Sequence, residues 1–201
     1  MSVEFTEATH YGAGMRRTSF AAMHCSMARS LEVMGDWWTP LILRDLHLGL
    51  ARFDELAEDL GISRNLLTTR LAALVERGLV ERRRYSERPP RHTYHLTEAG
   101  RDLVPVLTAL TAWGDRWLAP KQGPPLRLQH RTCGKFFTPT VACSRCGEAV
   151  SAEDVVAHGG PGGRTGPGTR LVAKVLRNRQ HAGATRRATR AAKADGAPLG
   201  L

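Results

Sequence analysis

The sequence predicts an α+β fold that is mainly helical, with one β-hairpin and a small cysteine-bearing segment on its C-terminal side. Apolar residues recur every three or four positions in five stretches between Ser26 and Leu118. Two of these stretches are separated by only three residues, Gly61 to Ser63. Two strand-like stretches then follow and flank a pair of prolines. Helix, short glycine turn, helix and hairpin, in this order, predict a winged helix-turn-helix.

The first two helices are expected at Ser26–Met34 and Trp37–His47. Ser26 is suited to cap the first helix, and Gly35-Asp36 separates it from the second. Pro40 is tolerated because it falls in the first turn of the second helix. That helix is apolar around much of its circumference, so we expect it to be central to the core.

The helix-turn-helix follows. Its first helix, Phe53–Leu60, carries acids on the outer face, and its second is expected over about residues 63–77. Ser63 is the predicted cap of this second helix, and Gly78 is predicted to end it in the left-handed conformation. The buried face is expected to consist of Leu67, Leu71 and Leu74.

The wing is expected over about residues 79–96, as strands Leu79–Ser86 and His92–Leu96. Residues 87–91 (ERPPR) are predicted to form a stiff tip that does not continue the ladder. A last helix is predicted from the Thr97 cap to about Leu118, with a kink or a late start caused by Pro105.

Positive charge is concentrated in two places. Residues 159–201 hold nine Lys or Arg and one acid, and this segment is predicted to be a flexible basic tail that binds phosphates nonspecifically. Residues 63–96 hold eight Arg and three Glu, whereas residues 36–60 hold six acids and two Arg. The second concentration puts a local positive surface on the predicted helix and wing, which favours a polyanionic partner.

Seven stretches in this order resemble the HxlR-type family of winged helix-turn-helix transcriptional regulators. They are residues 25–35 (CSMARSLEVMG), 38–46 (WTPLILRDL), 52–56 (RFDEL), 61–71 (GISRNLLTTRL), 78–82 (GLVER), 85–91 (YSERPPR) and 94–100 (YHLTEAG). The resemblance covers about ninety residues. It implies a DNA-binding homodimer, joined through the first and last helices of the domain, that represses or activates nearby genes. It does not imply an enzyme.

The residues support a DNA-binding surface independently of the family. If the leucine face is buried, Asn65 and Thr69 point outward, and Arg64 and Thr68 flank them near the end of the helix that meets base edges. Arg can bind guanine and Asn can bind adenine in the major groove. The alternative is a solvated basic face. Arg70 lies nearer the buried side, where an acid such as Glu55 could pair with it. The residues predicted to contact DNA are Ser63, Arg64, Asn65, Thr68, Thr69, Arg88, Arg91 and His92.

Four cysteines suggest two further sites. His130, Cys133, Cys143 and Cys146 form two pairs with a two-residue gap, each followed by a glycine. One imidazole and three thiolates match a tetrahedral structural zinc site, so we expect a zinc-ribbon-like segment over residues 126–158. The alternative is three free thiols in a loose hairpin. Cys25 occupies a position where some family members sense oxidants, and it is a redox-sensing candidate; a small buried or interfacial residue is the alternative.

The predicted organisation is therefore a flexible arm over residues 1–22, a DNA-binding and dimerisation domain over residues 23–120, the ribbon, and the tail from residue 159. Tryptophans 37, 38, 113 and 117 fill the core and the dimer seam or, alternatively, line a small-molecule effector pocket. No apolar run is long enough to span a membrane, so we expect a cytoplasmic protein. A non-catalytic interaction scaffold on the same fold is the rival function.

Overall fold

The computed structural model describes residues 19, 20 and 22–176 and divides the chain into two compact units. In the described part, the first unit comprises residues 34–150 and the second comprises residues 19–33 and 151–176, without residue 21. Most of the predicted N-terminal arm and the end of the tail, residues 177–201, lie outside the described residues. No helix in the described ranges is long and apolar enough to cross a bilayer.

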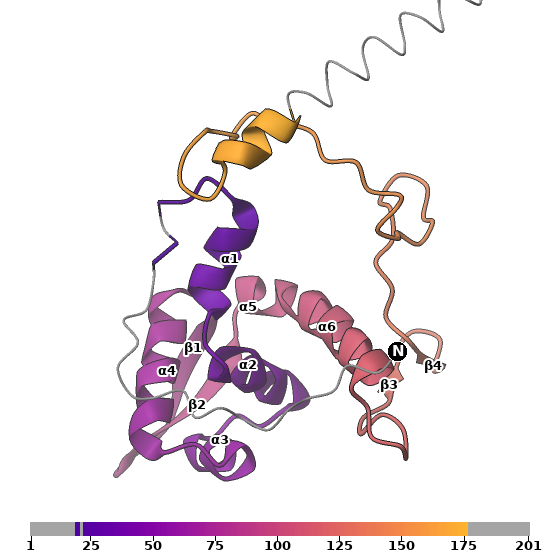
Figure 1. The fold of residues 1–201 in the computed structure, drawn as a ribbon. Coiled ribbons are helices and arrows are strands. Elements are labelled where there is room, and N and C mark those ends of the chain that lie inside the picture. The colour runs from indigo at the N-terminus through magenta and orange to yellow at the C-terminus, as the bar shows by residue number, and fades with distance from the viewer. Residues whose placement is uncertain (1–18, 21, 177–201) are drawn as a thin grey trace, which may run out of the picture. The chain divides into compact units, whose positions relative to one another are not determined.

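In the first unit, helix α2 (Trp38–Leu48) is central, as its apolar circumference predicts. It contacts α3 (Phe53–Leu60), α4 (Arg64–Glu76), α6 (Val104–Trp117) and strand β2 (Pro90–Leu96) (Figure 1). Ile42 and Leu43 of α2 are fully buried with Leu56 of α3. The helix ends at Gly49, whose φ of 106° is left-handed, so the expected C-terminal glycine cap is present.

The helix-turn-helix forms where the sequence predicts it. Helix α3 ends at Gly61 in the left-handed conformation, and the Ser63 hydroxyl accepts a hydrogen bond from the backbone N–H of Leu66 at 3.3 Å to cap α4. Leu67, Leu71 and Leu74 are at most 1% exposed. Burial of this leucine face orients α4, because it leaves one side of the helix against the core and the other outside.

Strands β1 (Val80–Glu87) and β2 form the antiparallel hairpin expected after α4. The ladder continues to the pair Glu87 and Pro90, so the prediction that residues 87–91 stay outside it is wrong. Proline lacks only the N–H, and the first residue of a strand can pair without it. The register shifts between Arg84 and Ser86.

The hairpin is joined to the start of α3 by backbone contacts. The Tyr94 N–H donates to the Ala51 carbonyl at 2.8 Å, and Arg52 forms an isolated antiparallel bridge with Thr93. These contacts attach β2 to the residues that lead into the helix-turn-helix. The wing is therefore fixed to the domain at its base by backbone groups as well as by Val80 and Leu96, which are buried.

The predicted last helix is two helices, α5 (Glu98–Asp102) and α6, separated at Leu103. This agrees with the break expected from Pro105, which lies in the first turn of α6. Thr97 caps α5: its hydroxyl accepts from the Gly100 N–H at 3.2 Å and donates to the Gly78 carbonyl at 2.6 Å. Helix α6 has no buried residue within the described structure.

Asp45 is a charged residue in the core. Its side chain is 1% exposed, and its Oδ2 has no hydrogen-bond partner among the described residues. Burial raises the pKa of this carboxyl above its usual range; the Arg44 guanidinium, which donates to Oδ1 at 2.7 Å, opposes the shift, and the Asp59 carboxylate adds to it.

A raised pKa in the folded state predicts how stability varies with pH. The folded protein holds the Asp45 proton more tightly, so its contribution is fully present below the unfolded pKa and is lost as pH rises through the folded pKa. Asp45→Asn removes this dependence. The unfolding free energy of the variant relative to the parent should therefore increase as pH rises from about 4, near the unfolded pKa, through the folded pKa. Urea unfolding of both proteins across this range measures it, and a difference independent of pH would contradict the assignment.

The second unit contains residues 151–176 and helix α1 up to Val33. Met34, the last residue of α1, belongs to the first unit. Helix α1 spans Ser26–Met34, and the Arg29 N–H donates to the Cys25 carbonyl at 3.0 Å, so Cys25 and not Ser26 precedes the helix. The Phe20 N–H donates to a Glu32 carboxylate oxygen at 2.7 Å. Residues 170–176, which lie in the segment predicted to be a flexible basic tail, are helical; residues 177–201 lie outside the described residues.

Candidate nucleic-acid interface

The outer face of α4 is the first part of the candidate interface. Asn65, Thr68 and Thr69 are exposed, as predicted from the opposite leucine face. Each threonine hydroxyl donates to a backbone carbonyl one turn earlier, Thr68 to Arg64 at 2.8 Å and Thr69 to Asn65 at 3.0 Å. Their oxygens can still accept hydrogen bonds, and the Asn65 amide offers both donors and an acceptor. Ser63 is exposed but its oxygen already caps the helix.

Arg64 is held by a contact that the sequence analysis missed. Its guanidinium lies 2.7 Å from the Asp54 carboxylate and 4.8 Å from the centre of the Phe53 ring. Both side chains of the ion pair are well exposed, 69% and 80%. An exposed pair of this kind contributes about 1 kcal/mol or less, so a phosphate or a guanine can replace Asp54 at little cost.

Asp54→Asn should raise DNA affinity because Arg64 no longer has a competing carboxylate and the acid near the interface is removed. We expect an increase of about threefold to tenfold at low salt, shrinking as salt is added. Fluorescence anisotropy with a labelled duplex measures this. Glu58→Gln is the control, since it makes the same charge change on the exposed side of α3, the helix that carries Asp54. An equal gain in DNA affinity for Glu58→Gln would show that only net charge matters.

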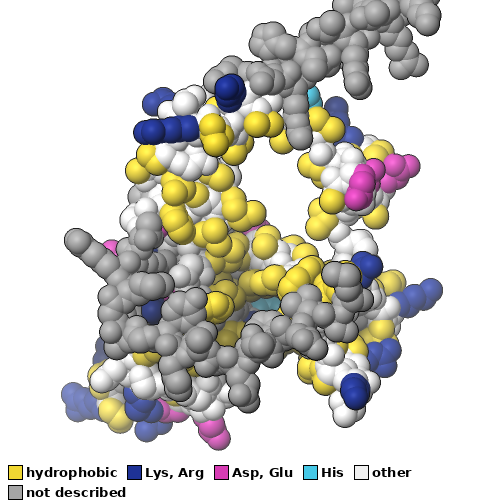
Figure 2. Space-filling model, in the orientation of Figure 1, with side chains coloured by type: hydrophobic (Ala, Val, Ile, Leu, Met, Phe, Trp, Pro, Cys, Tyr) yellow, Lys and Arg dark blue, Asp and Glu magenta, His cyan; other side chains and the backbone are white. Residues whose placement is uncertain are grey.

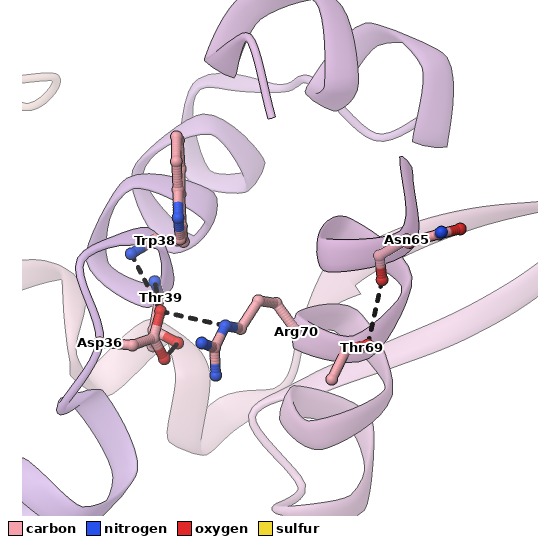
Figure 3. Close-up of polar contacts among 6 residues, drawn as sticks. All are labelled: Asp36, Trp38, Thr39, Asn65, Thr69 and Arg70. Atoms are coloured by element: carbon pink, nitrogen blue, oxygen red, sulfur yellow. Dashed lines mark hydrogen bonds and ion pairs between the residues drawn. The ribbon is translucent and has the colours of Figure 1, made fainter. Parts of the chain in front are cut away.

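Arg70 points from α4 toward the start of α2, away from Asn65 and Thr69 (Figure 3). Its Nε lies 3.5 Å from Asp36 Oδ1, and the side chains are 27% and 12% exposed. The suggested partner Glu55 is instead engaged with the backbone, accepting from the Arg52 N–H at 2.9 Å and from the Ala51 N–H at 3.2 Å. Spacing placed Arg70 correctly near the buried side but could not identify an acid 34 residues away.

The hairpin carries the second part of the interface. Arg88 and Arg91 are exposed at its tip, and His92 is half-buried. Arg82, Arg83 and Arg84 are all exposed although strand alternation puts them on two faces. Two of them form ion pairs along the strand, Arg83 with Glu81 and Arg84 with Glu87. Figure 2 shows Lys and Arg side chains gathered around the outer end of the hairpin and the start of α4.

The cysteine pairs lie after α6. Strands β3 (Leu128–Gln129) and β4 (Phe136–Phe137) flank the first pair, and an isolated bridge between Ala142 and Ala149 flanks the second. His130 Nδ1 lies 3.3 Å from Cys133 Sγ. Backbone hydrogen bonds from Arg145 and Cys146, and a side-chain contact with Cys146, lower the pKa of the Cys143 thiol. Within the described ranges, no three or more such side chains are gathered as a metal site.

A groove of about 780 Å³ lies between the C-terminal half of α6 and residues 124–141, which include the β3–β4 hairpin. Trp113 and Trp117 line it, but Trp37 and Trp38 do not, so the four tryptophans do not form one pocket. Trp37 is instead 84% exposed. The opposite wall, which includes Leu128, Phe136 and Phe137, was not predicted from the sequence. Two adjacent phenylalanines in a segment too short to have its own core could have indicated that this segment packs against another part of the chain.

Cys25 lies in the second unit, at the start of α1, and is half-buried. It therefore belongs to a different unit from α4 and the β1–β2 hairpin. Cys25, and not the predicted cap Ser26, is the residue that directly precedes the helix.

Comparisons with known proteins agree with the helix-turn-helix fold. The model of the HxlR-like helix-turn-helix family matches residues 33–122. The uncharacterised HTH-type transcriptional regulator Rv3095 of Mycobacterium tuberculosis is 48% identical over 137 residues, 68% of this chain and 87% of the relative. The HTH-type regulator sll1512 of Synechocystis is 38% identical over 95 residues, 47% and 70% of the two chains.

Two solved structures extend the comparison. The transcription-factor candidate PA1607 superposes with a TM-score of 0.59 at 36% identity, covering 66% of this chain and 93% of that one. PA1374 of Pseudomonas aeruginosa, also described as a transcription factor, gives 0.50 at 45% identity, covering 70% and 95%. With the hairpin after the helix-turn-helix and the ordered family match, this chain belongs to the HxlR-like helix-turn-helix family of transcriptional regulators.

Proposed function

We propose that the chain binds specific DNA sequences as a homodimer and thereby controls transcription of nearby genes. Helix α4 enters the major groove, and the β1–β2 hairpin contacts the neighbouring backbone or groove. The observation that carries the proposal is the exposed polar face of α4, with Asn65, Thr68 and Thr69 opposite a fully buried leucine face and beside an arginine-rich hairpin.

The contacts divide into two kinds. Asn65 and Arg64 are the candidates for reading bases, since Asn suits adenine and Arg suits guanine. Arg88 and Arg91 are exposed on a narrow hairpin and suit phosphates, which position the protein without selecting sequence. Acids on α3 lie on the N-terminal side of the turn. Within residues 36–96 the positive charge is therefore concentrated on α4 and the wing, which favours one docking orientation.

The first experiment selects genomic fragments retained by the full chain near physiological salt and then compares variants on the best fragment. Asn65→Ala should lose about 5-fold to 150-fold in specific affinity with little change on unrelated DNA. Arg91→Ala should weaken both kinds of binding and reduce the salt slope by about one.

A matched control tests whether helix perturbation explains such losses. Thr111 of α6 donates to the carbonyl four residues earlier at 3.0 Å, as Thr69 does on α4, and both are exposed. Thr69→Ala should weaken specific binding and Thr111→Ala should not. Full specific affinity in the Asn65→Ala/Thr69→Ala protein would mean that this face of α4 does not read the DNA. The rival function, a non-catalytic interaction scaffold, instead predicts that the parent chain retains no specific fragment.

The homodimer is proposed to form through α1 and α6. Along α6, Val106, Leu110, Trp113 and Trp117 are exposed at spacings of four, three and four residues, which make one apolar stripe. Such a stripe is typical of a helix that packs against another helix. Leu110→Glu should convert a dimer into a monomer in sedimentation equilibrium, whereas Thr111→Glu, next to the stripe, should leave it a dimer. Two monomeric or two dimeric variants would contradict the assignment.

We propose control by thiol redox state or by a small ligand. Oxidation of Cys25 would alter DNA binding, or a small ligand bound beside Trp113 and Trp117 would do so. In the first case, Cys25→Ser abolishes the response of DNA binding to diamide while the Cys133→Ser/Cys143→Ser/Cys146→Ser protein keeps it. A Cys25→Ser protein that responds like the parent would exclude Cys25 as the sensor.

A further inference from the structure

The two pairs His130/Cys133 and Cys143/Cys146 lie in turns of the same construction. In the first turn, the His130 N–H donates to the Lys135 carbonyl and the Gly134 N–H donates to the His130 carbonyl, both at 2.8 Å. In the second, the Cys143 N–H donates to the Glu148 carbonyl and the Gly147 N–H donates to the Cys143 carbonyl, again both at 2.8 Å. The chain therefore builds one six-residue turn twice, thirteen positions apart.

The glycine in each turn has a conformational reason. Gly134 and Gly147 have φ values of 66° and 77°, in the left-handed region. This conformation turns the backbone immediately after the second residue of each pair, so that residues i and i+3 lie on the same side of the turn. A repeated turn that brings together one pair of metal-ligand side chains each time is hard to explain by packing, because both segments are largely exposed.

The separation within the first pair fits two ligands of one metal ion. A tetrahedral ion bound at about 2.0 Å to nitrogen and about 2.3 Å to sulfur holds these two atoms about 3.5 Å apart. His130 Nδ1 and Cys133 Sγ are 3.3 Å apart without an ion. The imidazole is also oriented, since its ring meets Phe137 edge-on with centroids 5.9 Å apart.

The surrounding segment has little else to hold it together. Its strands β3 and β4 are two residues each, and Phe136, Phe137 and Val141 are exposed by 43% to 61%. A small segment of this kind commonly depends on a metal for its fold. The match to Rv3095 spans 137 residues. The chain has only 122 residues up to the end of the family match at residue 122, so the similarity to Rv3095 continues beyond the winged helix.

We propose that His130, through Nδ1, and Cys133, Cys143 and Cys146 bind one structural zinc ion that joins the two turns. Three thiolates and one imidazole are a preferred donor set for tetrahedral zinc. Binding releases the thiol protons, changes no oxidation state and leaves no position open for a substrate. Zinc brings the two pairs together, and it thereby holds Phe136 and Phe137 in the wall of the groove that faces Trp113 and Trp117.

The test uses the full chain, reduced, saturated with zinc and desalted without chelator. We expect about one zinc per chain by elemental analysis, and less than about a tenth after Cys143→Ser or Cys146→Ser. Cys25→Ser is the matched thiol control and should keep its zinc. A reduced parent chain with less than about a tenth of a zinc ion, or an equal loss in Cys25→Ser, would overturn the proposal.

Two further measurements distinguish ligation from misfolding. Cobalt substituted for zinc should give thiolate-to-metal charge-transfer bands and intense tetrahedral visible bands; His130→Cys should retain the metal with a shifted spectrum, and His130→Ala should weaken it at least about tenfold. Unchanged metal affinity in His130→Ala would exclude His130 as a ligand. Removing zinc with a chelator should shift tryptophan emission to the red in the parent, but not in Trp113→Phe/Trp117→Phe.

Discussion

Gly100→Ala should reduce the free energy of unfolding by about 2 to 4 kcal/mol. A Cβ at position 100 would lie 2.1 Å from the Leu79 carbonyl oxygen and 3.2 Å from its carbon, far inside contact distance. The obstacle is backbone, so no side-chain rotation relieves it. The same carbonyl accepts the Thr97 N–H at 3.0 Å, so any displacement also affects the start of α5.

The measurement is urea unfolding of parent and variant, followed by circular dichroism. Gly114→Ala in α6 is the control: nothing lies within 4 Å of a Cβ there, and alanine is favoured in helices by about 0.5 to 1 kcal/mol. Gly100→Ala should therefore lower the free energy of unfolding, and Gly114→Ala should raise it. A Gly100→Ala protein as stable as the parent would mean that α5 does not pack against the Leu79 backbone as described.

Asp36→Ala should cost about 2 to 4 kcal/mol of unfolding free energy. The carboxylate accepts the backbone N–H groups of Trp38 and Thr39, both at 2.9 Å, and the Thr39 hydroxyl at 2.7 Å, so it caps α2 (Figure 3). It also faces Arg70. The variant therefore loses a helix cap and leaves a guanidinium partly buried without its acid.

A double-mutant cycle separates these two roles. Arg70→Met removes the charge but keeps the cap, so it should cost less than Asp36→Ala, and the double variant should cost less than the sum of both. Glu58→Ala, an exposed acid on α3, should change stability by no more than about 0.5 kcal/mol. Strict additivity would show that the 3.5 Å contact contributes nothing.

The features predicted correctly from sequence are those that depend on neighbours along the chain. Helical spacing identified Leu67, Leu71 and Leu74, and cap chemistry identified Ser63, because both act within one or two turns. The sequence also indicated the break before α6, since Pro105 restricts its own backbone. The hairpin tip was misjudged because proline was treated as excluded from the ladder, although Pro90 begins its strand.

The features that were missed depend on side chains brought together by the fold. Arg64 pairs with Asp54 ten residues away, and Arg70 pairs with Asp36, which lies in the link between α1 and α2. Charge and periodicity predict on which face of a helix a residue lies, but not which residue it pairs with. The groove beside Trp113 and Trp117 likewise depends on where residues 124–141 fold back onto α6, which no local pattern specifies.

The backbone contacts at Ala51 and Arg52 have a consequence for regulation. Tyr94 and Thr93 of the hairpin are bonded to the segment that leads into α3, and the leucine face packs α4 against the same core, so the wing and α4 are both attached to one core. Under the proposed function, a signal would therefore act less on the position of the wing relative to α4. It would act on the distance and angle between the two domains of the dimer, and so on which half-site spacing the protein accepts.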